Sequence, residues 1–246
     1  MNQILVTKKL YITPELKRKK KIYKANFVLS IFFLVILISI YIYAAYARDK
    51  AEAVSQEILQ NAEKEQEDST VADSDVLIAV LNDTTDDGSE TPVVLDTTNK
   101  NKTKQQSPSG YTYVIDGKVT IPKINVEYAI LDGETDSEAE TEELLKISPV
   151  KFHGPEINEV GNYCIVGHNY RNSKFFSKVP TLVNGDIIQI TDSVGNMVQY
   201  QVYDKYVVDP TDVSCTSQNT GGKKEITLIT CTDDSKQRVI VKARAI

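Results

Sequence analysis

The sequence contains no tryptophan, two histidines and three cysteines among 246 residues. Three cysteines are too few for a disulfide-rich scaffold, and the lack of Cys-x-x-Cys or His-x-x-x-His spacing argues against a structural zinc site. A formal net charge of −6 argues against non-specific nucleic-acid binding as the main function. A hydrophobic fraction of 41% is nevertheless sufficient for a core, which excludes a fully disordered chain.

Charge is distributed unevenly along the chain. Residues 1–47 hold eight basic residues and one acidic residue, whereas residues 48–110 hold six basic and fourteen acidic ones. Residues 111–246 hold fourteen basic and nineteen acidic residues. The sign therefore reverses across an uncharged stretch at 25–47, which is the pattern that a membrane imposes.

The uncharged stretch has the length of a membrane span. Its core at 27–47 would form a helix of about 31 Å, against a hydrocarbon layer of roughly 30 Å. Three tyrosines gather at its far end, where amphipathic rings favour the interface: Tyr41, Tyr43 and Tyr46. Positive charges precede it, so we expect residues 1–24 to be a cytoplasmic tail, 25–47 a single-pass anchor, and the rest of the chain extracytoplasmic.

A cleaved signal peptide is the alternative, since Ala-Tyr-Ala at 45–47 resembles a cleavage site. The apolar run is longer than a typical signal peptide's, which favours the anchor. Residues 48–110 are predicted to be an acidic helical stalk followed by a flexible linker over 82–110. The stalk's apolar stripe of Val54, Ile58 and Ala62 is too narrow to demand a partner, so we expect a solvated helix.

Residues 111–246 are predicted to form one mostly β domain. One helix is expected at 137–146, with Ser137 as its cap and Glu140 completing a capping box, and a helical turn is expected at 174–179, stopped by Pro180. Successive strands with few helices favour a closed or nearly closed antiparallel barrel. The expected strands are 111–121, 127–131, 163–167, 186–192, 197–208, 225–231 and 238–245, with a short one at 150–153.

Few residues are available for nucleophilic chemistry. Cys231 and His168 each end an apolar strand, and Arg238 opens the next strand after a polar turn. A hairpin would bring Cys231 and Arg238 close together, although the sequence does not fix whether they share a face. Each residue also has a plain structural interpretation, as a buried small hydrophobe, a satisfied histidine or a solvated charge.

These residues carry a resemblance to the sortase family of membrane-anchored cysteine transpeptidases. The motif Thr-Leu-Ile-Thr-Cys at 227–231, with Arg238 after it and Gly167-His168 before it, resembles the family signature. The resemblance extends over residues 111–246. It includes the segments Val-Thr-Ile-Pro-Lys-Ile at 119–124, Asn-Gly-Asp at 184–186 and Asp-Pro-Thr-Asp at 209–212.

The resemblance implies an eight-stranded barrel and cleavage of secreted proteins at an LPxTG-type sorting signal. Cys231 would be the nucleophile, His168 the general acid and base, and Arg238 the group that holds the substrate and the oxyanion. Thr230, Asn169 and Ile229 would contact the substrate, and the loop over 208–224 would form one wall of the groove. The acceptor would be an amine of a peptidoglycan precursor or of a pilin.

No cofactor is expected. Some members of the family bind calcium through loop carboxylates, but Glu156 and Glu159 are better explained as an acidic surface loop. Cys164 is expected to be core packing and Cys215 to be free, with a disulfide between them as a minor alternative. Within the family, the sequence resembles the class A or the class D enzymes.

Two other functions are alternatives. A non-catalytic membrane-tethered β-domain would bind wall polymer or a partner protein. An L,D-transpeptidase or a papain-like peptidase would need His-Gly-Cys or Cys-Gly-Ser-Cys, and the chain has neither.

Overall fold

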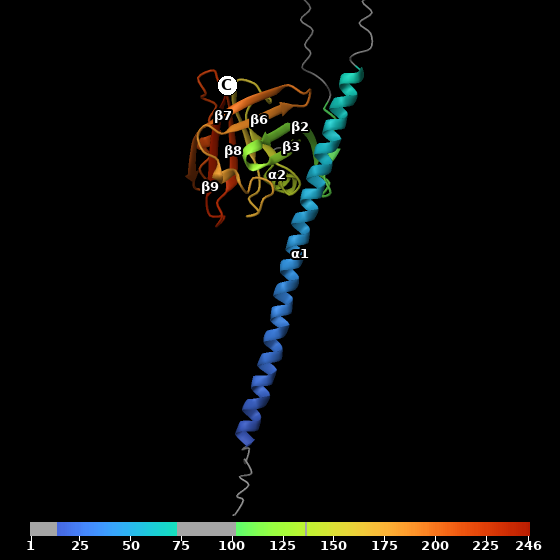
Figure 1. Ribbon diagram of the computed structural model, residues 1–246, viewed down its shortest axis with the longest axis vertical. Coiled ribbons are helices and arrows are strands. Elements are labelled where there is room, and N and C mark those ends of the chain that lie inside the picture. Colours follow the sequence, from blue (N-terminus) through green and yellow to red (C-terminus); the bar gives the residue numbers. More distant parts are fainter. Residues whose placement is uncertain (1–13, 73–101, 136) are drawn as a thin grey trace, which may run out of the picture. The chain divides into compact units, whose positions relative to one another are not determined.

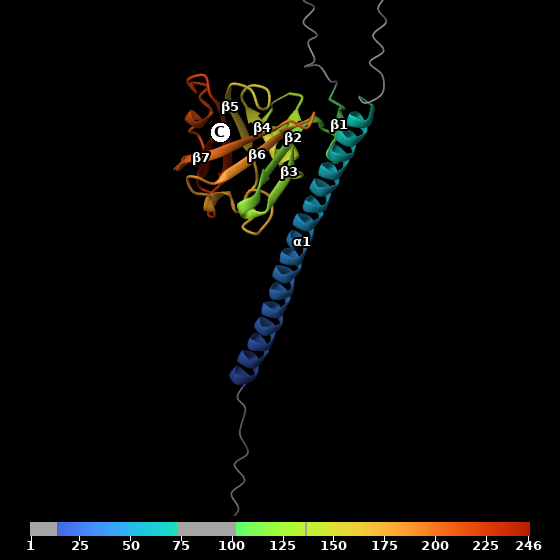
Figure 2. The same ribbon diagram turned by 45° about the horizontal axis from the view of Figure 1, so that its top comes forward.

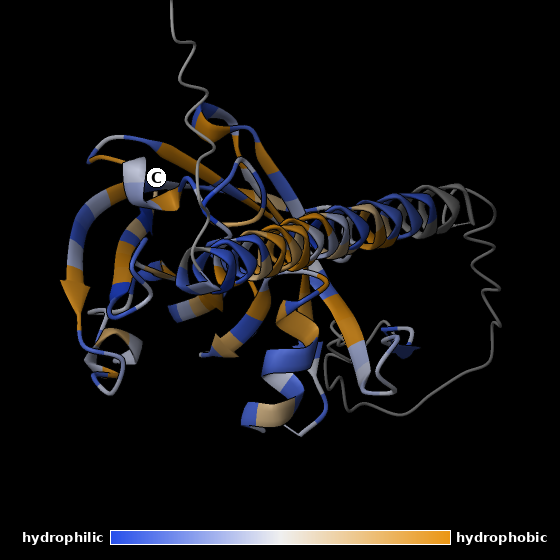
Figure 3. Cartoon of the chain, turned by 90° about the horizontal axis from the view of Figure 1, so that it is seen from below, coloured by the Kyte–Doolittle hydropathy of each residue, from blue (hydrophilic) through white to orange (hydrophobic). Residues whose placement is uncertain are grey.

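The computed structural model describes residues 14–72, 102–135 and 137–246, and the chain divides into two compact units, Met1–Lys50 and Ala51–Ile246. Helix α1 (Pro14–Ala72) runs through both units. In the first unit its large apolar side chains are exposed, and the helix is long and apolar enough to cross a membrane. Figure 3 shows this apolar stretch in orange. Part of the expected basic tail, residues 1–13, lies outside the described residues.

In the second unit, eight strands of the described chain close a barrel, which confirms the predicted fold class. A two-residue strand, β1 (Gln105–Gln106), extends the sheet beside β2. Figure 1 shows β2 and β6 side by side, where antiparallel pairing closes the barrel. The eight strands are β2 (Thr112–Ile121), β3 (Val126–Gly133), β4 (Val150–His153), β5 (Gly161–Val166), β6 (Ile187–Asp192), β7 (Met197–Val208), β8 (Lys224–Cys231) and β9 (Arg238–Ala245).

The barrel is mixed, so the expectation of an antiparallel sheet was wrong. Its strand order is β2-β3-β4-β5-β8-β9-β7-β6, and the pairs β3–β4 and β5–β8 are parallel. Figure 2 shows β4 and β5 next to each other. The crossovers explain the parallel pairs, because helix α2 (Glu138–Leu145) separates β3 from β4, and two further strands separate β5 from β8.

The barrel interior is filled by apolar side chains that alternate along the strands, as expected for a closed sheet. Tyr163, Tyr200, Phe175 and Phe176 are among its largest fully buried members. Phe175 and Phe176 come from the connection between β5 and β6, so this loop reaches into the core. A loop anchored in the core is held in place, which matters because it carries His168.

The start of the second unit is a packed helix, and the expectation of a solvated stalk was wrong. Ile58 and Leu59 are each 6% exposed and pack against apolar residues of β2, β3 and α2. Ser55 is fully buried and shares a hydrogen bond with Ser148 (Oγ to Oγ, 3.4 Å). The three buried residues are spaced i, i+3 and i+4 along one helical face. Because the first of them is a serine, this face could not be recognised as apolar from the sequence.

The expected flexible linker also differs from the structure over residues 102–110. Lys102 is ion-paired with Asp116, whose side chain is fully buried and also accepts a hydrogen bond from Tyr163 Oη (2.5 Å). Together with the pairing of β1 with β2, these contacts fasten the segment to the barrel. The remainder of the expected linker, 82–101, lies outside the described residues.

Helix α2 has the predicted cap, because Ser137 Oγ accepts a hydrogen bond from the Glu140 N–H (3.3 Å). The predicted reciprocal bond differs: the Glu140 carboxylate accepts from the N–H groups of Glu134 and Thr135 instead. The helical turn expected to stop before Pro180 contains it, as the short 3₁₀ helix η2 (Val179–Thr181). Proline suits the first turn of a helix, where its missing N–H costs nothing.

Candidate active site

Cys231 and Arg238 face each other across a hairpin. Cys231 ends β8, Arg238 begins β9, and the two are direct register partners in the antiparallel pair. Directly opposed residues project to the same side of a sheet, with Cβ atoms about 4.5–5.5 Å apart. The register therefore settles what the sequence left open, namely that the thiol and the guanidinium share a face. Both residues are half-buried.

His168 leaves the neighbouring strand at the same edge. Strand β5 runs parallel to β8, and its last residue, Val166, is paired with Ile229. The alignment continues past the strand: the Gly167 N–H donates to Ile229 O (3.0 Å), and Thr230 Oγ1 donates to Gly167 O (2.8 Å). The alignment therefore continues as far as Gly167 and Thr230, so that His168 and Cys231 are the next residues at the same edge of the sheet.

Asn169 ties the two strand ends together. Its side-chain amide donates to Cys231 O (2.9 Å) and to the carboxylate of Asp233 (3.0 Å). Asn169 thus holds the backbone of the candidate nucleophile against the segment that carries His168. Of the three residues expected to contact substrate, Asn169 and Thr230 bind backbone at this edge, and Ile229 lines the adjacent cavity.

Gly167 allows a close approach that a side chain would prevent. A Cβ atom at this position would lie 2.5 Å from the ring of Phe176. The Phe176 N–H also donates to His168 O (3.0 Å). The aromatic ring and this hydrogen bond fix the backbone on both sides of His168.

The environment of His168 favours the neutral imidazole. Burial lowers its pKa, and the positive charge of Lys146 acts in the same direction, whereas the negative charge of Glu142 raises it. Both charged residues belong to α2 or its C-cap. Burial is thus the main influence on the histidine, and the two charges of α2 and its C-cap act on it in opposite directions, which the sequence did not indicate.

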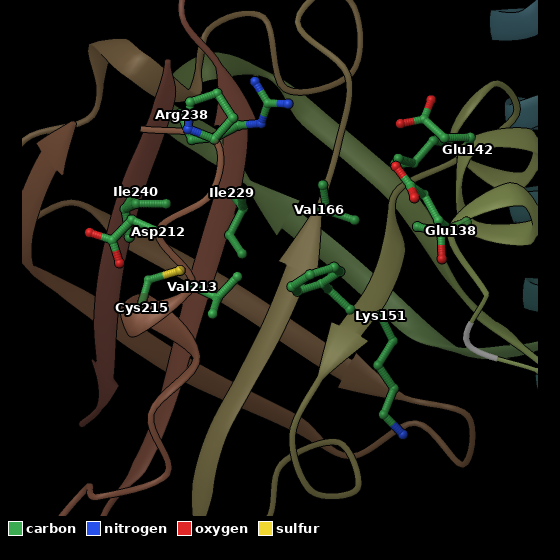
Figure 4. A pocket seen from close by; sticks show the side chains of 14 residues that line it. Glu138, Glu142, Lys151, Val166, Asp212, Val213, Cys215, Ile229, Arg238 and Ile240 are labelled. Carbon is green, nitrogen blue, oxygen red and sulfur yellow. The ribbon is translucent and has the colours of Figure 1, made fainter. Parts of the chain in front are cut away.

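A cavity of about 400 Å³ opens beside Arg238. Figure 4 shows Glu138 and Glu142 on the α2 side and Arg238 on the opposite side, with Val166 and Ile229 between them. Pro210, Asp212, Val213 and Cys215, from the connection between β7 and β8, complete the lining. These four residues belong to the 208–224 loop, which was predicted to form one wall of a groove. The centre of the cavity is apolar, and its rim carries charges of both signs.

The three cysteines differ in exposure. Cys164 is fully buried, Cys215 is 4% exposed, and only Cys231 among the three is half-buried. Burial raises the pKa of Cys164 to about 12 and also raises that of Cys215. All three are free thiols, so the minor alternative of a disulfide is not found. Accessibility and position both select Cys231 for chemistry.

The loop carboxylates considered for calcium have other surroundings. Glu156 accepts a hydrogen bond from Lys102 (3.2 Å) and is also ion-paired with Lys151 (3.6 Å). Glu159 is exposed. Over the described ranges, no three acidic, histidine or cysteine side chains gather in a way that could hold a metal ion.

Comparison with known proteins points to one family. The family model of the sortase domain matches residues 119–246, more than half of the chain. The search of curated proteins found no match. Among solved structures, the chain is similar to a sortase D5 transpeptidase of Clostridium perfringens, with 31% identity and a TM-score of 0.46 over 54% of this chain and 79% of that one.

Two further structures are similar at lower identity. Sortase C-1 of Actinomyces oris shares 23% identity over 53% of this chain and 72% of that one, with a TM-score of 0.46. A lid mutant of sortase A from Corynebacterium diphtheriae shares 24% identity over 56% of this chain and 74% of that one, with a TM-score of 0.46.

Proposed function

The chain belongs to the sortase family of cysteine transpeptidases, and we propose that it joins secreted proteins bearing an LPxTG-type sorting signal to an amine of the cell wall or of a pilin. The observation that carries this proposal is the direct pairing of Cys231 with Arg238, beside the strand end that bears His168. A nucleophile, a fixed cation and a proton carrier at one sheet edge are the groups that amide transfer needs.

In the first half of the reaction, the Cys231 thiolate attacks the carbonyl carbon of the scissile Thr–Gly bond. The tetrahedral intermediate collapses to a thioester, and the C–N bond breaks as the protonated form of His168 donates its proton to the leaving amine, which leaves the imidazole neutral. Arg238 presents a permanent positive charge and several N–H donors to the developing oxyanion and to the substrate backbone.

In the second half, the acceptor amine attacks the thioester carbon. The neutral His168 takes the proton of the amine, the thiolate leaves, and a new amide bond remains. Since burial favours the neutral imidazole, His168 is suited to this step at neutral pH. Water competes with the amine, and its success would give hydrolysis instead of transfer.

The cavity beside Arg238 is the proposed binding site for the sorting signal. Ile229, Val166 and Ile240 give it an apolar lining that suits a leucine side chain, and the loop after β7 forms one wall. Substrate contacts of Thr230 and Asn169 would use their backbone groups, because both side chains bind the barrel backbone. The proposed steps call for no cofactor.

We also propose that α1 anchors the protein with its N-terminus in the cytoplasm, and that residues 48–246, which include the catalytic domain over 111–246, are extracytoplasmic. The support is the apolar stretch of α1 together with the basic residues that precede it. Protease treatment of intact cells should remove the domain and leave the tail protected. A protected domain would contradict this topology.

The test uses the full chain in detergent micelles with a panel of quenched fluorogenic LPxTG-type peptides, with and without a glycine-based amine acceptor. Cys231→Ala should abolish both cleavage and transfer, whereas Cys164→Ala, in the core, should keep them. The two histidines give a second matched pair, because His168→Gln should lose turnover while His153→Gln keeps it. Unchanged turnover in Cys231→Ala would refute the assignment.

A further inference from the structure

A hydrogen-bonded path joins the helix of the second unit to the loop that follows His168. The hydroxyl of Tyr128, on β3, donates to the carboxylate of Glu52 on α1, with both oxygens 2.9 Å away. The same hydroxyl accepts a hydrogen bond from the backbone N–H of Phe175 (2.9 Å). Tyr128 is 4% exposed. Its single hydroxyl group therefore connects, inside the protein, two segments that are far apart in the sequence.

A second path of stacked rings runs to the histidine. The Tyr128 ring is stacked on that of Phe175, with centroids 5.0 Å apart and planes within 7°. Phe175 meets Tyr170 edge-on (5.3 Å, 79°), and Tyr170 lies against the imidazole of His168 (5.0 Å, 43°). Such ring pairs have preferred geometries, so a displaced Tyr128 would disturb the neighbours that hold the imidazole.

The backbone at Phe175 requires this support. Its φ of +50° is uncommon for a residue other than glycine. Phe175 also forms an isolated bridge with Asn169, the residue that holds Cys231 O. A conformation of this kind persists only where the surroundings over-determine it, and Tyr128 supplies both a hydrogen bond and a stacked ring.

The helix itself is held independently of Glu52. Ile58 and Leu59 are buried against the barrel, Ser55 is bound to Ser148, and Lys118 Nζ donates to Glu63 (2.9 Å). These contacts keep the helix in place, so the Glu52 carboxylate is a fixed acceptor for Tyr128 and not a mobile surface charge.

We propose that Glu52 and Tyr128 are positioning residues for His168, so that the helix segment next to the anchor is a working part of the active site. The inference rests on the proposed function, in which His168 transfers protons. It predicts that loss of the Glu52–Tyr128–Phe175 path leaves the fold intact while the loop after His168 loosens and the imidazole changes its environment.

The first test is spectroscopic and needs no substrate. The chain has two histidines, so ¹³C-histidine labelling of the full chain in micelles gives two imidazole signals, which His153→Gln assigns. Tyr128→Phe should move the His168 signal and its titration midpoint, and should speed amide exchange at Phe175. Tyr113→Phe is the matched control, because Tyr113 is equally buried in the same sheet and its hydroxyl bonds to Gln105 instead.

A series at Glu52 separates positioning from folding. Glu52→Gln keeps an oxygen acceptor for the Tyr128 hydroxyl and should largely retain the wild-type signals, whereas Glu52→Ala removes the acceptor and should reproduce the effect of Tyr128→Phe. Glu57→Gln, at an exposed position of the same helix, is the control for charge loss. If Glu52→Gln instead gives the same signals as Glu52→Ala, Glu52 acts through its charge, and the hydrogen bond to Tyr128 is not what positions His168.

The second test is kinetic. For Glu52→Ala and Tyr128→Phe we expect kcat to fall about tenfold, since small displacements of a proton-transfer group are costly. KM should stay within about twofold, because the cavity is untouched. Wild-type chain without peptide turnover would refute the proposed function, while the spectroscopic test would still decide the positioning role. The positioning role would be overturned if Glu52→Ala and Tyr128→Phe gave the same His168 signals and the same loop exchange as Tyr113→Phe.

Discussion

Replacing Leu59 by alanine tests whether the helix that follows the anchor is part of the catalytic domain. The Leu59 side chain is 6% exposed and packs in a cluster with residues of β2, β3 and α2. Truncation of a buried leucine removes its apolar contacts and leaves a cavity, which typically costs 2–5 kcal/mol. Leu59 lies on a docked helix at the margin of the domain, where neighbours can partly close the gap, so we expect about 3 kcal/mol.

For a unit of this size, each kcal/mol corresponds to about 2–4 °C in Tm. Leu59→Ala should therefore lower Tm by about 6–12 °C. The chain lacks tryptophan and has 13 tyrosines, so tyrosine fluorescence follows the unfolding of the full chain in micelles. Amide exchange over residues 51–63 gives a second, local readout, because a weakly docked helix opens more often.

Gln60→Ala is the matched control, since it changes the adjacent, exposed position of the same helix. It should change stability by no more than about 0.5 kcal/mol. If Leu59→Ala and Gln60→Ala have the same Tm and the same exchange rates over 51–63, the helix is not docked and the reasoning fails.

Two further predictions concern the histidine. If His168 is the proton donor, the alkaline limb of the kcat/KM profile follows its pKa. Glu142→Gln removes a negative charge that raises this pKa and should move the limb to lower pH, whereas Lys146→Gln removes a positive charge and should move it to higher pH. Equal profiles for the two variants and the wild type would contradict the role of these charges. Gly167→Ala would place a Cβ atom 2.5 Å from the Phe176 ring, and we expect it to lower stability by about 1–3 kcal/mol and to reduce turnover, as thermal unfolding and peptide cleavage would measure.

The strands were predictable because their side chains alternate and turn residues separate them. Strands β7 and β9 occupy the predicted segments, 197–208 and 238–245. The direction of neighbouring strands was not predictable in the same way, since it depends on crossovers such as the one through α2. The pairing of Cys231 with Arg238 depended on the register of one hairpin, which a sequence without a two-residue turn leaves open.

The surroundings of the candidate site were less accessible to sequence reasoning. Glu52, Tyr128 and Phe175 are linked through one hydroxyl, although 76 residues separate the first two and 47 the last two. Nothing in the local pattern marks Tyr128 as different from the other twelve tyrosines. The docked face of α1 was not predicted because its first buried residue is Ser55. This serine is buried with a hydrogen bond to Ser148, so it does not contribute to an apolar pattern in the sequence.

The position of β9 constrains the order in which the enzyme can be assembled. It is the last strand along the described chain, yet it lies between β8 and β7 in the sheet. During synthesis, the strand that carries Cys231 therefore lacks its antiparallel partner until residues 238–245 have emerged. Barrel closure must await this late, long-range pairing, so the thiol gains its guanidinium neighbour only as folding is completed. The newly made chain is thus expected to stay inactive until it is folded.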